Sequence, residues 1–311
     1  MKKNINRYLI LLVSISALLN ACNKKIDDAF LNPNATTRVP IETLLPGIIG
    51  NFIGSSSAQG SAYGLANDGL YVGRYVQFWA TNTANNQYDR MGGATGASDV
   101  LGSVWAMHYY GFGQNLGRMM EWGEEEKKWD YVGVGHAIRA FGWLSLTDMY
   151  GEAILKQAFD AGRLVFDYDT QEEIYQEVRK ECHIAISFLN KTGDNVSQAN
   201  LALGDAYFYN GDVNKWKKFA YSILARSFNH YSNKASYQPD SVIYYTNLGI
   251  NTVADMASVK FANTGITGTS NFFGPVRGNI NVLRQTRFIA ELLTGVNSRF
   301  PGVEDPRVAY L

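Results

Sequence analysis

The stretch that decides the fold reads Asp205-Ala-Tyr-Phe-Tyr-Asn-Gly-Asp-Val-Asn-Lys-Trp-Lys-Lys-Phe-Ala-Tyr-Ser-Ile-Leu-Ala-Arg226. Asp212 follows the helix breaker Gly211, and its carboxylate can accept hydrogen bonds from the free N–H groups of a first helical turn. Beyond it, apolar residues recur every three or four positions as far as Tyr231, and lysines occupy the opposite face. The pattern predicts an amphipathic helix over residues 213–231.

Helix signals of the same kind stand on the N-terminal side of this stretch. Thr170 and Glu173 have the spacing of a capping box, in which two side chains satisfy free backbone N–H groups. An apolar stripe follows as far as Leu189 and includes Cys182. Residues 131–150 are apolar nearly all round, which predicts a central, buried helix. Further helices are predicted over residues 41–53, 68–80 and 98–121.

Proline is missing from residues 47–238, where an average usage of about 5% would place about nine. Because proline inside a helix costs about 3 kcal/mol, this gap favours helix. The starts of three strong helices, near 131, 171 and 212, have the regular spacing of stacked helical hairpins. We predict an all-α fold of tetratricopeptide-like hairpins, with long irregular loops over residues 81–96 and 263–278.

The composition fits a globular protein and excludes several classes. Of the 311 residues, 46% are hydrophobic and 18% charged, which excludes a disordered or collagen-like chain. Basic and acidic residues number 28 each, so the chain lacks the concentrated positive charge that nucleic-acid binding requires. The 19 tyrosines suit half-exposed contact surfaces, because each ring ends in a polar hydroxyl.

The first 21 residues have the pattern of a secretory signal peptide, with Lys2, Lys3 and Arg7 before a short apolar run. The next residue is Cys22, and the sequence Leu19-Asn-Ala-Cys22 resembles a bacterial lipobox. We therefore predict that Cys22 carries acyl chains that anchor the protein. Residues 22–40 are assigned to the lipidated cysteine and a flexible tether, and residues 41–311 to the helical domain. Cys182 then has no disulfide partner and is predicted to be a small buried hydrophobe.

No catalytic signature is recognisable, since the chain has no Gly-x-Ser-x-Gly elbow, Cys-x-x-Cys pair or His-Glu-x-x-His helix. The four histidines have no metal-ligand spacing, and each is predicted to be a hydrogen-bonded helical residue: His108, His136, His183 and His230. A glycosidase, which needs only two suitably spaced carboxylates, is the alternative that the sequence leaves open. The one acid-rich loop near aromatic residues contains Glu152, Asp160, Asp167 and Asp169. We predict a protein that is not an enzyme and has no metal or cofactor.

A binding surface is predicted where aromatic and amide side chains alternate. Sugar rings stack on aromatic faces, while amides and arginine pair with hydroxyl groups. This mixture occurs at Trp79, Asn82, Asn86, Gln87, Tyr88 and Arg90. The alternative is that Phe78 and Trp79 belong to the core and the rest is a solvated loop. Residues 271–277, with Phe272 next to Phe273, form a second candidate.

Three segments resemble the SusD/RagB family of outer-membrane nutrient-binding lipoproteins: residues 136–152, residues 168–189 and the stretch 205–226 quoted above. The run Asn210-Gly-Asp-Val-Asn-Lys-Trp-Lys-Lys-Phe-Ala220 is the most specific part. Two features depart from the family. Ile154 stands where relatives usually have proline, and residues 305–311 resemble a mid-chain segment, so the helical domain is expected to be incomplete at its C-terminus.

The resemblance implies a lipoprotein that is anchored to the outer membrane and faces the cell exterior. It would bind a nutrient glycan or oligosaccharide and deliver it to a SusC-like TonB-dependent transporter. No enzymatic activity and no cofactor are implied. Peptides as the ligand, or a helical protein-interaction scaffold without a small ligand, are the alternatives.

Overall fold

The computed structural model describes residues 38–53, 72–81, 102–160, 162–261 and 283–310. Cys22 and the predicted signal peptide therefore lie outside the described residues, as do nearly all of the two predicted long loops. The chain divides into Met1–Pro40 and Ile41–Leu311, and the elements below belong to the second unit. Most described residues are helical, which confirms the predicted fold class.

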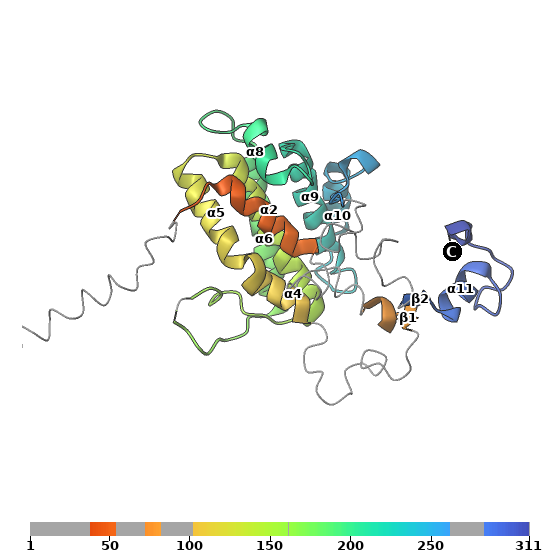
Figure 1. Cartoon of the computed structure of the whole chain (residues 1–311). Helices are drawn as coiled ribbons and strands as arrows, with labels where there is room; N and C mark the ends of the chain where they lie inside the picture. Colours follow the sequence, from red (N-terminus) through yellow and green to blue (C-terminus); the bar gives the residue numbers. More distant parts are fainter. Residues whose placement is uncertain (1–37, 54–71, 82–101, 161, 262–282, 311) are drawn as a thin grey trace, which may run out of the picture. The chain divides into compact units, whose positions relative to one another are not determined.

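Helices make up nearly all of the regular structure (Figure 1). In chain order the elements of the helical bundle are η1 (Ile41–Thr43), α2 (Leu44–Ile53), α4 (Gly102–Ala106), η3 (Met107–Phe112), α5 (Gly113–Glu125), α6 (Trp129–Tyr150), α7 (Gln171–Leu189), α8 (Gln198–Asp205), α9 (Val213–Asn229), α10 (Pro239–Leu248) and η4 (Val253–Asp255). The remaining elements are β1 (Trp79–Thr81), β2 (Leu283–Gln285), α11 (Arg287–Thr294) and η6 (Pro306–Tyr310).

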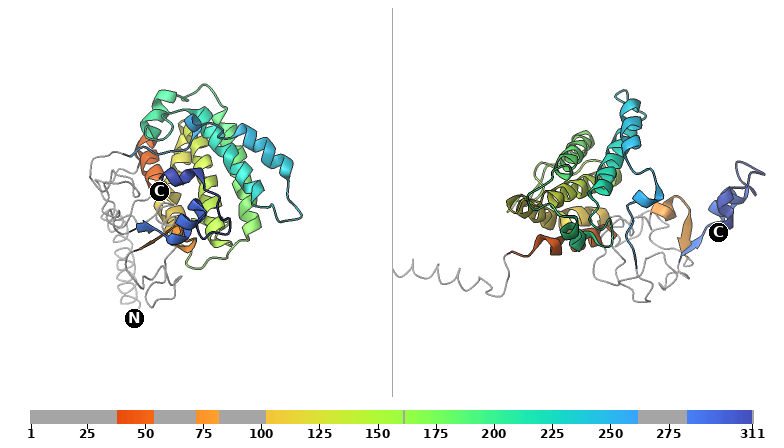
Figure 2. Two further views of the ribbon diagram at one scale, coloured as in Figure 1. Left: turned by 90° about the vertical axis from the view of Figure 1, so that its right-hand side faces the viewer. Right: turned by 90° about the horizontal axis from the view of Figure 1, so that it is seen from above.

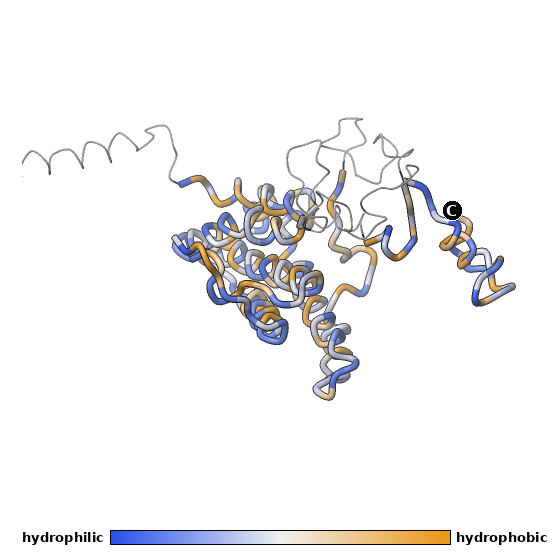
Figure 3. Tube along the Cα trace, turned by 90° about the horizontal axis from the view of Figure 1, so that it is seen from below, coloured by the Kyte–Doolittle hydropathy of each residue, from blue (hydrophilic) through white to orange (hydrophobic). Residues whose placement is uncertain are grey.

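The bundle is a stack in which each long helix packs against the next. Helix α5 contacts α6, α6 contacts α7, α7 contacts α9, and α9 contacts α10; Figure 2 shows these helices lying side by side. Helix α6 also contacts α9, and most of its residues are buried, as its all-round apolar sequence predicts. Apolar and polar residues are mixed along the helices (Figure 3), and α5, α7 and α9 bury apolar residues at helical spacing along one face.

The quoted stretch folds around one buried carboxylate. Asp205 is 1% exposed and accepts hydrogen bonds from the backbone N–H of Gly211, at 2.5 Å, and from the indole Nε1 of Trp216, at 2.8 Å. Asp212 then caps α9, as predicted, by accepting from Asn214 N and Lys215 N. Asp205 thus joins the end of α8 to the first turns of α9.

A second carboxylate closes the loop between α6 and α7. Asp169 accepts from the backbone N–H groups of Leu155, at 2.8 Å, and Lys156, at 2.9 Å, and it pairs with Ala153 in an isolated β-bridge. Directly after it, Thr170 and Glu173 form the predicted capping box at the start of α7. These contacts fix the base of the 20-residue connection. Burial raises the pKa of the Asp169 carboxyl, but the hydrogen bonds that it accepts outweigh this effect, and the pKa is lowered.

Two of the predicted helices differ from the structure. Residues 72–75 are helical, but Gln77 has a φ of +61° and the chain continues as strand β1, so the helix predicted over 68–80 is wrong at its C-terminal end. The helix predicted over 98–121 exists as α4, η3 and α5, and η3 is a π-helical turn. Such a turn accommodates an extra residue, which 3.6-residue periodicity does not reveal.

Candidate functional site

A short β-ribbon positions Trp79, the candidate ligand residue that the structure describes. Strands β1 and β2 are antiparallel, with Trp79 opposite Gln285 and Thr81 opposite Leu283. The pairing extends one residue further, because Thr286 N donates to Phe78 O at 3.2 Å and the Thr286 hydroxyl contacts Gln77 O.

Gly73 leaves the space that the indole of Trp79 occupies. A Cβ at Gly73 would lie 2.1, 2.4 and 2.7 Å from three neighbouring atoms of the benzene ring. These similar distances put the glycine over the ring face rather than at its edge. A side chain at residue 73 would therefore push the indole away. The Phe78 N–H donates to Gly73 O at 2.8 Å, which fixes the turn between the glycine and the ribbon.

Helix α11 follows β2 directly and supplies the apolar wall of the site. Thr286 is its N-cap, and the hydroxyl accepts from Ile289 N at 3.3 Å. Ile289, Leu292 and Leu293 lie on one face of the helix, because they are spaced three and four residues apart. The chain returns beside this helix, where Asp305 N donates to Leu293 O at 2.8 Å.

An ion pair marks the polar edge of the site. The Arg307 guanidinium donates from Nε and one Nη to the two oxygens of Asp305, at 2.8 and 2.7 Å. These hydrogen bonds lower the pKa of Asp305 to about 2, so the carboxylate is charged at neutral pH. This pair, joined by two parallel hydrogen bonds, is called the Asp–Arg fork below. Such a pair still has free acceptor lone pairs on the carboxylate and free N–H donors on the guanidinium.

Together these elements border an open cleft of about 460 Å³, within the range typical of small-molecule sites. Its lining consists of Phe78, Trp79, Gln285, Ile289, Leu292, Leu293, Asp305 and Arg307. Phe78 is 46% exposed and lies 6.4 Å from the Trp79 ring in an edge-to-face arrangement. The cleft combines aromatic faces with an amide and a charged fork at the rim, which is the combination that sugar rings require.

Trp79 is thus half-buried in a cleft wall and does not belong to the buried core. The other predicted ligand residues, namely Asn82, Asn86, Gln87, Tyr88 and Arg90, lie outside the described residues, as does the second candidate over 271–277. Their role stays a prediction. Gln285, Asp305 and Arg307 were not predicted, because the sequence does not show that residues 283–307 fold back beside residue 79. The apolar spacing over 288–293 was the available signal.

The histidines of the bundle do not converge on a common site. His136 contacts Glu181 at 2.5 Å, and His230 contacts both Asp148 and Tyr175 at 2.9 Å. The prediction of a hydrogen-bonded side chain is wrong for His108, which is 2% exposed and has no hydrogen-bond partner for either ring nitrogen among the described residues. Burial, together with Arg139, lowers the pKa of His108 to about 3, so its ring is neutral.

The acid-rich loop uses its carboxylates for local structure. Asp167 accepts from Gln157, Asp160 pairs with Arg163, and Asp169 closes the loop as described above. Within the described ranges, no three histidine, cysteine or acidic residues are arranged to hold a metal ion. Every helix described is too short or too polar to cross a bilayer.

Solved structures share this fold. A chitin-binding SusD homologue from Flavobacterium johnsoniae superposes with a TM-score of 0.68 at 17% identity, over 86% of this chain and 53% of that one. A SusD-like protein from Bacteroides thetaiotaomicron gives 0.64 at 19%, over 86% and 52%. A SusD-like protein from Bacteroidetes AC2a gives 0.63 at 21%, over 88% and 50%. The chain therefore spans about half the length of these proteins.

The sequence itself matches one family over nearly its full length. No curated protein matches the chain, but the SusD-like family profile, described as starch-binding and associating with the outer membrane, matches residues 33–308. The three segments 136–152, 168–189 and 205–226 lie inside this range. The fold and the profile agree, and the chain belongs to the SusD-like family of outer-membrane-associated binding proteins.

Proposed function

We propose that this chain is part of a surface lipoprotein, anchored through Cys22, that captures an oligosaccharide and passes it to a SusC-like TonB-dependent transporter. The observation that carries the proposal is the Trp79 cleft, where an indole face, an amide and an Asp–Arg fork line one hollow. The chitin-binding relative supports a glycan as the ligand class. In this proposal the protein binds without catalysis, and its binding site needs no metal or cofactor.

The expected affinity is modest. A ligand that places about 15 to 20 atoms in contact, at ~0.3 kcal/mol each, would gain roughly 5 to 6 kcal/mol, which corresponds to a Kd near 0.1 mM. Weak binding suits a protein that must release its cargo to a transporter. The residues Asn82, Asn86, Gln87, Tyr88 and Arg90 are proposed to add polar contacts.

Titration calorimetry with starch and chitin oligosaccharides tests the cleft. Trp79→Ala should weaken binding about 5- to 30-fold, the equivalent of a lost aromatic contact of roughly 1 to 2 kcal/mol. Trp79→Phe should retain much of the affinity. Tyr207→Ala is the matched control, because Tyr207 is 72% exposed and lies outside the cleft lining.

Three results would contradict the cleft assignment: equal binding by wild type and Trp79→Ala, a loss of binding in Tyr207→Ala as large as in Trp79→Ala, or binding of short peptides in preference to oligosaccharides. Anchoring and partnership are tested separately in cells. Cys22→Ala should release the protein from membranes, and the wild type should co-purify with a TonB-dependent barrel after mild detergent extraction. A membrane-bound Cys22→Ala variant would exclude acylation at Cys22 as the anchor.

A further inference from the structure

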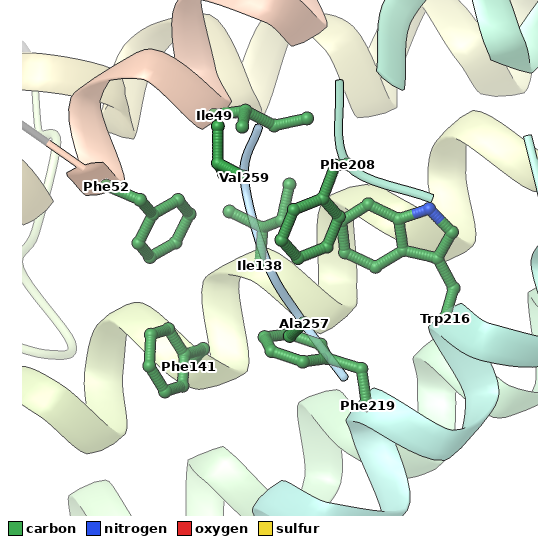
Figure 4. Close-up of a pocket in the computed structure, with 9 residues that line it drawn as sticks. All are labelled: Ile49, Phe52, Ile138, Phe141, Phe208, Trp216, Phe219, Ala257 and Val259. Atoms are coloured by element: carbon green, nitrogen blue, oxygen red, sulfur yellow. The ribbon is translucent and has the colours of Figure 1, made fainter. Parts of the chain in front are cut away.

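A separate cavity of about 230 Å³ opens into the helical bundle. It shares no lining residue with the Trp79 cleft. Its walls come from α2, α6, α9 and the turn that precedes α9, and five of its side chains are aromatic: Phe52, Phe141, Phe208, Trp216 and Phe219. Figure 4 shows these rings gathered around one space, with the aliphatic side chains of Ile49 and Ile138 between them.

Among the described residues that line this cavity, no side chain offers a free polar group. Its lining is aliphatic or aromatic, and Trp216 contributes the only side-chain N–H among these residues. That N–H already donates to Asp205 at 2.8 Å. A charged or strongly hydrogen-bonding ligand would lose its hydration here without compensation. The chemistry of the walls therefore restricts the occupant to an uncharged, mainly hydrocarbon group.

An extended segment, residues 256–260, borders the cavity and is tied at both ends. Before it, Asp255 accepts from Lys218 and Thr252, at 2.7 Å each, and Tyr209 donates to Asp255 O. At its other end, Lys260 N donates to Tyr207 O at 3.2 Å. Side chains alternate along an extended chain, and accordingly Ala257 and Val259 line the cavity (Figure 4), whereas Ser258 is not among the lining residues.

From these features we infer that the cavity is a binding site for a small, uncharged aromatic molecule of one or two rings. Apolar cavities of about 150 Å³ are known to bind benzene, so the available volume is sufficient. The Trp216 and Phe219 rings already meet edge to face at 5.6 Å and 87°, an arrangement that a further ring can extend. A peptide is disfavoured as the occupant, because its backbone polar groups would find no partner in these walls.

The full chain is tested with toluene and with benzoate, which has a similar size but carries a charge. Toluene should raise Tm in a saturable way, and calorimetry should give one site, whereas benzoate should have no effect. Val259→Phe fills the cavity and should weaken toluene binding at least tenfold. Ser258→Phe introduces the same side chain on the other face of the segment and should bind toluene as the wild type does.

The inference is overturned if toluene does not bind, if benzoate or a phenylalanyl peptide binds more tightly, or if Val259→Phe binds toluene as the wild type does. If Val259→Phe fails to fold, Ala257→Leu fills the same space from the cavity mouth and is judged by the same criterion. Trp79→Ala should leave toluene binding unchanged, so this test is independent of the proposed glycan site.

Discussion

Gly211 occupies a position that other residues do not tolerate, for two separate reasons. Its φ is +79°, and a Cβ there would lie 2.2 Å from the Gln198 carbonyl oxygen. Gly193 has a similar φ of +82°, but a Cβ there would meet nothing within 4 Å. A comparison of alanine substitutions at the two glycines therefore separates the cost of backbone strain from the cost of steric conflict.

We expect Gly193→Ala to lower the free energy of unfolding by about 1 kcal/mol, the low end of the cost of a left-handed non-glycine residue. Gly211→Ala should cost at least about 3 kcal/mol, because the first turn of α8, which includes Gln198, must also move away. Urea denaturation of both variants measures the difference. Equal losses would show that the contact between residue 211 and α8 does not matter for stability.

His108 gives stability a pH dependence with a definite sign. Its pKa is about 3 in the folded protein and about 6.5 in an unfolded chain. Between these values the unfolded state binds a proton and the folded state does not, so stability falls as the pH is lowered. At pH 4.5 this histidine should cost about 2–3 kcal/mol.

His108→Leu should remove that cost without leaving a buried polar group unpaired. We expect the variant to lose less stability than the wild type between pH 6.5 and pH 4.5, measured by urea denaturation at each pH. His183→Leu is the control, since His183 is exposed. Parallel pH profiles for the wild type and His108→Leu would contradict the assignment.

At the scale of an element, the connection between α6 and α7 depends on its closing carboxylate. Asp169→Ala removes the acceptor for Leu155 N and Lys156 N, which should cost about 1–3 kcal/mol and expose both amides to exchange. Hydrogen exchange should show faster exchange at residues 155 and 156, while the middle of α7 stays protected. Asp167→Ala is the control, because Asp167 is exposed and pairs only locally with Gln157. If the amide exchange rates at residues 155 and 156 are unchanged in Asp169→Ala, the proposed role of Asp169 is refuted.

The whole bundle protects Cys182, whose prediction as a small buried hydrophobe is confirmed. The thiol is fully buried, and burial raises its pKa. A thiol reagent should therefore modify Cys182 only when the bundle opens, at least about 10³-fold more slowly than in urea. The measurement uses Cys22→Ser, so that Cys182 is the only cysteine, and Ser258→Cys in that background as the exposed control. Fast labelling of native Cys182 would show that α7 opens locally.

The features that the sequence predicts well are those determined within one or two helical turns. The caps at Thr170 and Asp212 and the buried helix over 131–150 depend on neighbouring residues, and all three are present. The β-ribbon was missed because its two strands are three residues each and about 200 residues apart. For the same reason, the sequence alone does not show that Trp79 and Arg307 line one cleft. A long-range site is predictable only where the chain path is known.

One consequence of Gly73 concerns residues that act on the cleft without lining it. Gly73 is not among the residues that border the cleft, yet a Cβ at this position would lie 2.1 Å from the Trp79 ring. A single added methyl group at residue 73 should therefore displace the indole and weaken oligosaccharide binding while every side chain of the cleft lining is unchanged.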